Sequence, residues 1–209
     1  ATDSAGAEVA VDIAGDLLTV TPQPVLDETC RVAAVTAGGL AVADSAVLRF
    51  AEHHGVRSVT NRAAVAVACD SLGLAEAMLA ATVSYVQTRE QFGRPIGSFQ
   101  AVKHACADML VKISVARALV HAAVDALVAD GCDPANDADA AVAMAKSYTC
   151  GAAVEVVGKA LQLHGGIGYT WESGIHAYLK RAAFNRALFG SPAAHRQHLA
   201  QRYRTSKAK

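Results

Sequence analysis

The sequence predicts a mainly α-helical protein in which an antiparallel, up-down helical bundle follows a few antiparallel β-strands. Three observations predict this class. Apolar side chains recur every three or four residues through long segments after residue 61, as in helices that bury one face. The loops between these segments are short, which favours antiparallel neighbours. Residues 1–44 instead show short alternating runs broken by glycine and proline, which is typical of strands.

Residues 1–44 are expected to hold two strand pairs, with turns at Gly15-Asp16 and Gly38-Gly39. Pro22 and Pro24 suit an edge strand or a connector, because proline cannot donate a ladder hydrogen bond. The expected strands are 8–14 with 17–21, and 31–35 with 39–43. Four short strands cannot form an independent sheet with a filled face. We therefore expect 1–44 to be part of an incomplete β-domain and 45–209 to be the bundle domain.

The second region is expected to begin with a short helical stretch at 47–52 and a break at 55–58. Five helices follow. A proline after a serine predicts the start of the last one, with Ser191 as N-cap and Pro192 as first residue. Gly131 and Pro134 are expected to end the second helix and start the third. The five expected helices cover about 61–89, 98–130, 135–163, 174–188 and the residues after 191.

The bulk properties exclude several classes of protein. The chain has 209 residues, 53% hydrophobic, and a formal net charge of zero, which argues against a nucleic-acid or anionic-membrane surface. Charged residues and glycines interrupt the apolar runs, so no membrane span is expected, and no signal peptide is visible. Five cysteines without C-x-x-C spacing disfavour disulfide frameworks and zinc sites, so the expected location is cytoplasmic.

Two motifs carry candidate chemistry. Residues 85–100 combine a helix end with a glycine and a proline, in a turn that presents Arg89 and Phe92. Guanidinium suits a diphosphate and a phenyl ring suits a flat ligand, although a helix-terminal cation beside a buried aromatic explains the same residues. Residues 162–172 place three glycines in four positions after Gln162. Glycines allow close approach of a ligand, but they also form plain helix stops.

The order, separation and helical context of these motifs resemble the acyl-CoA dehydrogenase family. The first motif, Arg89-Glu90-Gln91-Phe92-Gly93-Arg94-Pro95-Ile96, resembles one family signature, and Gln162-Leu163-His164-Gly165-Gly166-Ile167-Gly168-Tyr169 resembles another. The resemblance assigns 1–44 to the closing strands of the family's β-domain and 45–209 to its C-terminal helical domain. It covers only the second half of a usual member.

The resemblance implies a flavoprotein subunit. Family members bind FAD and oxidise an acyl-CoA thioester to a 2-enoyl-CoA, in lipid metabolism that includes fatty acid and steroid side-chain β-oxidation. It implies that Arg89, Phe92, Gln162 and Gly166 contact FAD of a neighbouring subunit, and that Ser191 keeps a hydroxyl contact. It also implies an oligomer and an electron-acceptor flavoprotein as partner.

The two positions where the family keeps its catalytic glutamate hold Ala63 and Phe189 here. The resemblance then implies a non-catalytic subunit paired with a paralogous catalytic one, as in bacterial heterotetramers of the sterol side-chain type. Three alternatives stay open: a homo-oligomer, an active enzyme that uses Asp70 as a relocated base, and a structural bundle that has lost flavin. Asp70 is also readily explained as a surface or interhelix carboxylate.

The histidines give weaker signals. His53 and His54 fall in an expected loop, and His195 and His198 lie three residues apart near the start of the last helix. No acidic residue or cysteine converges on them in sequence, so we expect solvated histidines and no metal site. His164 is expected to pack at an interface. The sequence does not identify the acyl substrate.

Overall fold

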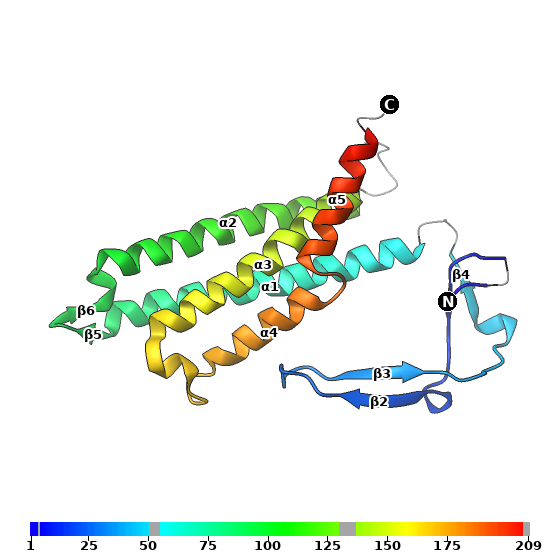
Figure 1. Cartoon of the computed structure of the whole chain (residues 1–209), viewed down its shortest axis with the longest axis horizontal. Helices are drawn as coiled ribbons and strands as arrows, with labels where there is room; N and C mark the ends of the chain where they lie inside the picture. Colours follow the sequence, from blue (N-terminus) through cyan, green and yellow to red (C-terminus); the bar gives the residue numbers. More distant parts are fainter. Residues whose placement is uncertain (4, 51–54, 130–136, 207–209) are drawn as a thin grey trace. The chain divides into compact units, whose positions relative to one another are not determined.

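The computed structural model describes residues 1–3, 5–50, 55–129 and 137–206, with side chains described to residue 204. The chain divides into two compact units, Ala1–Arg62 and Ala63–Lys209. The described residues form mainly helices, preceded by short antiparallel strands, which confirms the predicted fold class (Figure 1). The division into a β-domain at 1–44 and a bundle domain at 45–209 stays a prediction.

The strands of the first unit pair in two antiparallel ladders. In the first, Val9 lies opposite Arg49 and Val11 opposite Val47; in the second, Thr19 lies opposite Thr36. Pro22 lies in β2 of the second ladder. Because this ladder has only two strands, each of them is an edge strand, as the prediction for Pro22 requires. The four strands are β1 (Val9–Val11), β2 (Thr19–Gln23), β3 (Val32–Thr36) and β4 (Val47–Arg49).

Three predictions for this region are wrong. Strand β1 pairs with β4 and not across the Gly15 turn, where residues Gly15–Leu17 form a short 3₁₀ helix. Residues 39–43 form no strand, because β3 takes β2 as its partner. The expected helix at 47–52 begins as strand β4, since its first three residues complete the ladder with β1. Pairing between distant segments decided each case.

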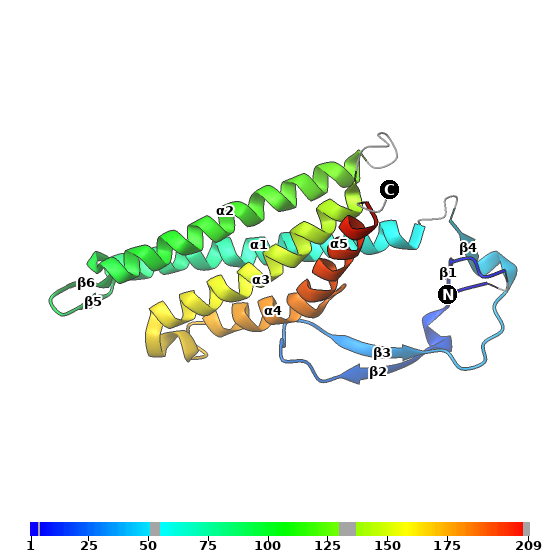
Figure 2. The same ribbon diagram turned by 45° about the horizontal axis from the view of Figure 1, so that its top comes forward.

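Five helices form the bundle of the second unit, and Figures 1 and 2 show α1, α2 and α3 running lengthwise beside one another. The expected break at 55–58 is wrong, because α1 is already helical from Gly55. Gly131 and Pro134 lie outside the described residues. Helix α1 (Gly55–Thr88) ends within one residue of its predicted end, and α5 (Pro192–Ser206) starts at the predicted proline. The other three start and end within three residues of the predicted positions: α2 (Gln100–Val128), α3 (Ala138–His164) and α4 (Ile175–Ala187).

Helix α3 lies at the centre of the bundle and contacts α2, α4 and α5. Its many alanines and valines are buried on several sides, and small side chains allow neighbouring helices to approach closely. On α2, Met109, Ile113, Ala116 and Val120 are buried at helical spacing, whereas Val124 is 39% exposed. The main core combines α1, α2, α3 and α4, with large members Leu72, Met78, Met109, Ile113, Val120, Val156, Val157, Leu161 and Ile175.

Among the described helices, α1 is the one long and apolar enough to cross a membrane by length and composition. In its most apolar window, 39% of the residues are buried inside the structure. A single such helix is weak evidence, because the core helix of a soluble protein meets the same criteria. The expectation of no membrane span stays a prediction.

Candidate functional site

The two sequence motifs meet at one end of the bundle. The first contains a hairpin of β5 (Glu90–Gln91) and β6 (Arg94–Pro95), and the second contains the 3₁₀ turn η4 (Gly165–Tyr169). Figures 1 and 2 place the hairpin and the end of α3 at the same end. The ring of Tyr85 stacks on that of His164, with centroids 4.4 Å apart. The Tyr85 hydroxyl also donates to the His164 carbonyl at 3.3 Å, so residues 79 positions apart are held side by side.

The hairpin projects an aromatic side chain. Phe92 lies at its tip with φ of 55° and is 92% exposed, and Gly93 follows with φ of 76°. A left-handed phenylalanine costs about 1–2 kcal/mol, which the surrounding turn must offset. Its ring meets Phe99 edge-on at 6.0 Å, and the Arg94 guanidinium lies 4.2 Å from the centre of the Phe99 ring. The structure thus fixes the turn and leaves the Phe92 ring in solvent.

Two polar side chains at this end have no partner among the described residues. The Arg89 backbone is fixed, since its N–H donates to Tyr85 and its carbonyl accepts from Ile96, both at 2.8 Å. Its guanidinium is exposed and makes no hydrogen bond or ion pair within the described part of the chain. The same holds for the exposed Gln162 amide, although the Gln162 carbonyl accepts from the Gly165 N–H.

Of two glycines in the second motif, Gly166 and Gly168, packing within the chain requires only one. A Cβ on Gly168 would lie 2.9 Å from the carbonyl oxygen of Leu161, so the packing of η4 on α3 requires glycine there. A Cβ on Gly166 would meet nothing within 4 Å. Gly166 is exposed, and packing within this chain gives no reason for it. The space beside it is open to a ligand or to a neighbouring chain.

The loop between α4 and α5 holds two further predicted residues. Ser191 accepts the Ala194 N–H at 3.2 Å through its hydroxyl oxygen, which confirms its prediction as the N-cap of α5. Phe189 has φ of 50° and its side chain is 48% exposed. Gly190 follows with φ of 95°. Two consecutive left-handed residues make this a specific turn and not an extended connector.

Asp70 links α1 to α4. Its Oδ2 atom accepts from Arg181 Nε at 2.9 Å and from Asn185 Nδ2 at 2.6 Å. The sequence allowed two roles for Asp70, a relocated catalytic base or a carboxylate between helices. These bonds match the second role. Ala63 is half-buried on α1, two turns before Asp70. The structure therefore gives Asp70 a bonding role between helices.

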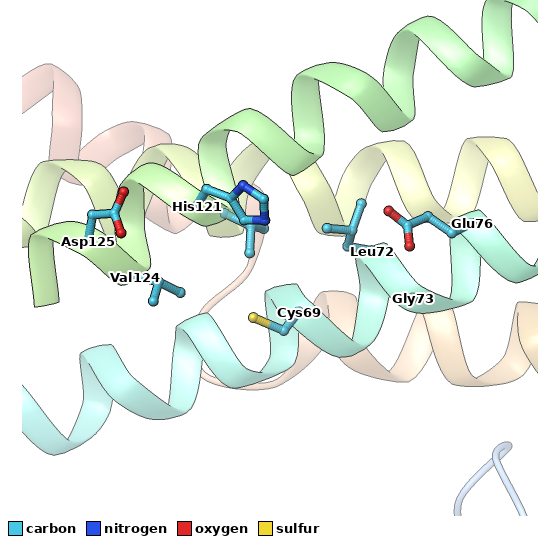
Figure 3. Close-up of a pocket in the computed structure, with 8 residues that line it drawn as sticks. Cys69, Leu72, Gly73, Glu76, His121, Val124 and Asp125 are labelled. Carbon is cyan, nitrogen blue, oxygen red and sulfur yellow. The ribbon is translucent and has the colours of Figure 1, made fainter. Parts of the chain in front are cut away.

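A groove of about 420 Å³ lies between α1 and α2 (Figure 3). Figure 3 shows Cys69 on α1 pointing toward α2, and burial raises the pKa of the Cys69 thiol. Glu76, at one side of the groove, is tied to Arg117 at 2.8 Å. None of the predicted site residues lines it. Its lining is Cys69, Leu72, Gly73, Glu76, Val120, His121, Val124 and Asp125.

The histidines have structural roles. His195 is half-buried, and its Nε2 donates to the Phe189 carbonyl at 2.9 Å, which ties this side chain to the turn between α4 and α5. His164 is buried within the chain, and its Nδ1 bonds the Ala160 carbonyl at 2.8 Å. Its packing at an interface stays a prediction. His53 and His54 lie outside the described residues. In the described ranges, no group of three or more His, Cys, Asp or Glu could hold a metal ion.

Sequence reasoning missed one buried group beside the C-terminal end of α4, the side chain of Lys146. Lys146 is fully buried on α3 and bonds the backbone carbonyls of Asn185 and Gly190. A signal was present, because Lys146 is one of only two lysines in a helix dominated by alanine and valine. A lysine within a buried stripe predicts a specific partner.

Comparison with known proteins connects this arrangement to one family. A model of the acyl-CoA dehydrogenase C-terminal domain matches residues 53–204. Acyl-CoA dehydrogenase IpdE2 of Mycolicibacterium smegmatis is 37% identical over 177 residues, which cover 85% of this chain and 50% of the relative. Acyl-CoA dehydrogenase FadE34 of Mycobacterium tuberculosis is 38% identical, with 82% of this chain and 23% of the relative covered.

A solved structure described as a steroid ACAD variant of Tcur3481-Tcur3483 superposes with a TM-score of 0.82 and 28% identity. The alignment covers 100% of this chain and 55% of that one. Butyryl-CoA dehydrogenase from Megasphaera elsdenii, at 24% identity and a TM-score of 0.79, shares the fold. The chain spans about half or less of the length of the curated relatives above.

Proposed function

The chain belongs to the acyl-CoA dehydrogenase family, and we propose that it is a subunit of an FAD-dependent enzyme to which it lends flavin-binding groups while lacking a catalytic glutamate. When bound, FAD supplies hydride acceptance for the α,β-dehydrogenation of an acyl-CoA thioester. One observation carries the proposal. Two exposed side chains without partners in the described chain, Arg89 and Gln162, lie at the end of the bundle where Gly166 leaves open space.

The residues at this end fit the cofactor chemically. The Arg89 guanidinium offers paired N–H donors that match a diphosphate, and its backbone is already fixed by two hydrogen bonds. The Gln162 amide can donate to a phosphate or hydroxyl oxygen. The open side of Gly166 admits close approach of a flat or charged ligand. Ser191 lies at the other end of α4 from these residues, and its hydroxyl still has a proton to donate because its oxygen accepts the cap bond (Figure 1).

Arg89, Gln162 and Gly166 are exposed, which supports a site shared with another subunit. Phe92 is 92% exposed on a strained turn, and an exposed aromatic of this kind is typical of a group that becomes buried on a partner. We propose a paralogous acyl-CoA dehydrogenase subunit as that partner, with a second copy of this chain as the other outcome. An electron-acceptor flavoprotein would reoxidise the complex.

The proposal assigns the proton-abstracting base to the partner. The two expected base positions hold Ala63 and Phe189, and neither side chain can accept a proton. Asp70 is engaged by Arg181 and Asn185 at hydrogen-bond distance, so its Oδ2 atom is committed to α4. Within this chain, the proposed role is to orient the cofactor and to cover it from solvent. A bulky, steroid-type acyl group is the proposed substrate class, because a similar structure is a steroid ACAD.

The test is co-expression with a paralogous acyl-CoA dehydrogenase subunit. We expect the purified complex to carry FAD, visible as flavin absorbance, and to oxidise acyl-CoA, whereas the isolated chain does neither. Arg89→Ala and Gln162→Ala should lower flavin occupancy, and Arg186→Ala, an exposed arginine on α4, is the matched control. Unchanged occupancy in both site variants would contradict the assignment.

Two other outcomes decide the alternatives. Acyl-CoA oxidation by the chain alone would sink the non-catalytic role, and Asp70→Asn would then show whether Asp70 is the base. A stable complex that never binds flavin would instead identify a structural bundle.

A further inference from the structure

Lys146 is a fully buried lysine that bonds only backbone carbonyls. It lies in the first third of α3, and its Nζ donates to the carbonyls of Asn185 at 3.0 Å and Gly190 at 3.1 Å. Among the described residues it has no carboxylate partner. Burying an ammonium group costs several kcal/mol unless hydrogen bonds offset it. A residue retained at this cost calls for a reason beyond filling the core.

One of the two bonds stabilises the end of α4. Asn185 lies in the last turn of that helix, where carbonyl groups lack intrahelical partners and the helix dipole is negative. The Lys146 ammonium satisfies such a carbonyl. The Asn185 side chain is fixed as well, since Nδ2 donates to Asp70 at 2.6 Å and to the Ser71 hydroxyl at 3.3 Å. Helices α1, α3 and α4 are therefore joined at Asn185.

The other bond holds the turn that follows. Phe189 and Gly190 have φ of 50° and 95°, and left-handed phenylalanine is costly. Both carbonyls of this pair are held by donors from different helices. His195 of α5 bonds the Phe189 carbonyl at 2.9 Å, and Lys146 of α3 bonds the Gly190 carbonyl. The turn is thus clamped from both sides, and Ser191 follows directly as the N-cap of α5.

We propose that Lys146 is a positioning residue: by holding the Gly190 carbonyl it fixes the turn that carries the Phe189 ring, and so it keeps the Ser191 hydroxyl in place for a flavin. The inference rests on the proposed function. Without the ammonium, two buried carbonyls lose their donor, and the left-handed pair loses one half of its clamp. The turn then relaxes, and the Ser191 hydroxyl no longer meets the cofactor in a fixed place.

The first readout concerns the turn itself. A fluorinated phenylalanine is placed at position 189 in the whole chain, and its ¹⁹F spectrum is recorded. We expect one sharp resonance in the wild type, because the turn is fixed. In Lys146→Met we expect several broad resonances in its place, because the turn relaxes. Lys159→Met, an exposed lysine on the same helix, should keep the single line. A wild-type spectrum in Lys146→Met overturns the proposal.

The second readout is the FAD dissociation constant of the complex with the paralogous subunit. Loss of the charged donor should raise it about tenfold in Lys146→Met. Val156→Ala, which removes core volume from α3 away from the turn, controls for a plain loss of stability. Val156→Ala should leave both the ¹⁹F line and the dissociation constant unchanged. An equal effect of both variants on FAD would make Lys146 merely structural and would overturn the proposal.

A second variant keeps the test falsifiable if Lys146→Met does not fold. Gly190→Ala forces a side chain into left-handed backbone and places its Cβ 2.8 Å from His195 Nε2, so it disturbs the same turn with Lys146 intact. It should reproduce the altered ¹⁹F spectrum and the weaker FAD binding; an unaltered spectrum and unaltered affinity overturn the inference. If the wild-type complex binds no FAD, the proposed function fails and the role toward flavin fails with it. The ¹⁹F comparison then still reports whether Lys146 fixes the turn, so the two failures are distinguishable.

Discussion

The ring of Tyr85 lies on the ring of His164 with centroids 4.4 Å apart and planes inclined by 23°. This contact joins the end of α1 to the end of α3 and so brings together the two motifs. His164 is anchored in turn, because its Nδ1 bonds the Ala160 carbonyl at 2.8 Å, and a carbonyl can only accept. Nδ1 therefore carries the proton. The spacing between Arg89 and Gln162 depends on this stacked pair.

Replacing His164 by leucine should lower the free energy of unfolding by about 1–2 kcal/mol, because the stacking and the Nδ1 hydrogen bond are both lost. Tyr85→Phe should cost less, about 0.5–1 kcal/mol, since only a long hydroxyl bond is removed. Urea denaturation of the whole chain measures both. Tyr178→Phe, on α4, is the control and should be neutral. An equally neutral His164→Leu would show that the pair does not hold the two motifs together.

Gly168→Ala and Gly166→Ala form a matched pair with opposite expectations. Gly168→Ala should destabilise the chain by about 1–3 kcal/mol, because its Cβ would lie 2.9 Å from a backbone oxygen. Gly166→Ala should change stability by no more than about 0.5 kcal/mol, as its Cβ meets nothing within 4 Å. Thermal and urea unfolding check these values. In the complex, Gly166→Ala should nevertheless reduce flavin occupancy; full occupancy would place the cofactor elsewhere.

Asp70→Asn should destabilise the chain by about 1 kcal/mol, because it weakens the bonds to Arg181 and Asn185 across a half-exposed contact. Glu76→Gln breaks the Arg117 pair between α1 and α2, where both side chains are similarly exposed. It should cost at most about 0.5 kcal/mol, since both donors to Glu76 belong to one half-exposed arginine. Denaturant midpoints compare the two. A smaller effect of Asp70→Asn would mean that the junction at Asn185 does not depend on this carboxylate.

His195 should make stability depend on pH. Burial lowers the pKa of the His195 imidazole from 6.5, and the nearby Lys146 and His198 lower it further, while the bond to Phe189 opposes this. The unfolded chain then binds the proton more readily than the folded chain. Stability should therefore rise with pH from the folded-state pKa to about 6.5 and show no His195 contribution above that value.

His195→Gln tests this prediction, because the amide keeps a donor for the Phe189 carbonyl but does not titrate. The difference in unfolding free energy between wild type and variant, measured at several pH values, should slope below about pH 6.5 and be flat above it. A flat difference at every pH would contradict the lowered pKa.

The sequence by itself determined most of the helix ends in the bundle, because their signals are local, although it missed the start of α1 at Gly55. A serine before proline placed the start of α5, and glycine after Gln162 placed the end of α3, both through neighbouring backbone groups. The first motif also predicted a turn that presents Arg89 and Phe92, and both are exposed at one end of the bundle together with Gln162. Their contacts with FAD remain a prediction.

Only the tertiary structure decided which distant groups meet. The alternating apolar pattern located β1 but could not show that its partner is β4. The sequence had instead predicted a helix at the residues that form β4. Nothing near Asp70 in sequence announced Asn185, and nothing near Lys146 announced the Gly190 carbonyl. Such contacts follow from how helices pack across the core, whereas caps and periodicity follow from backbone geometry within a few residues.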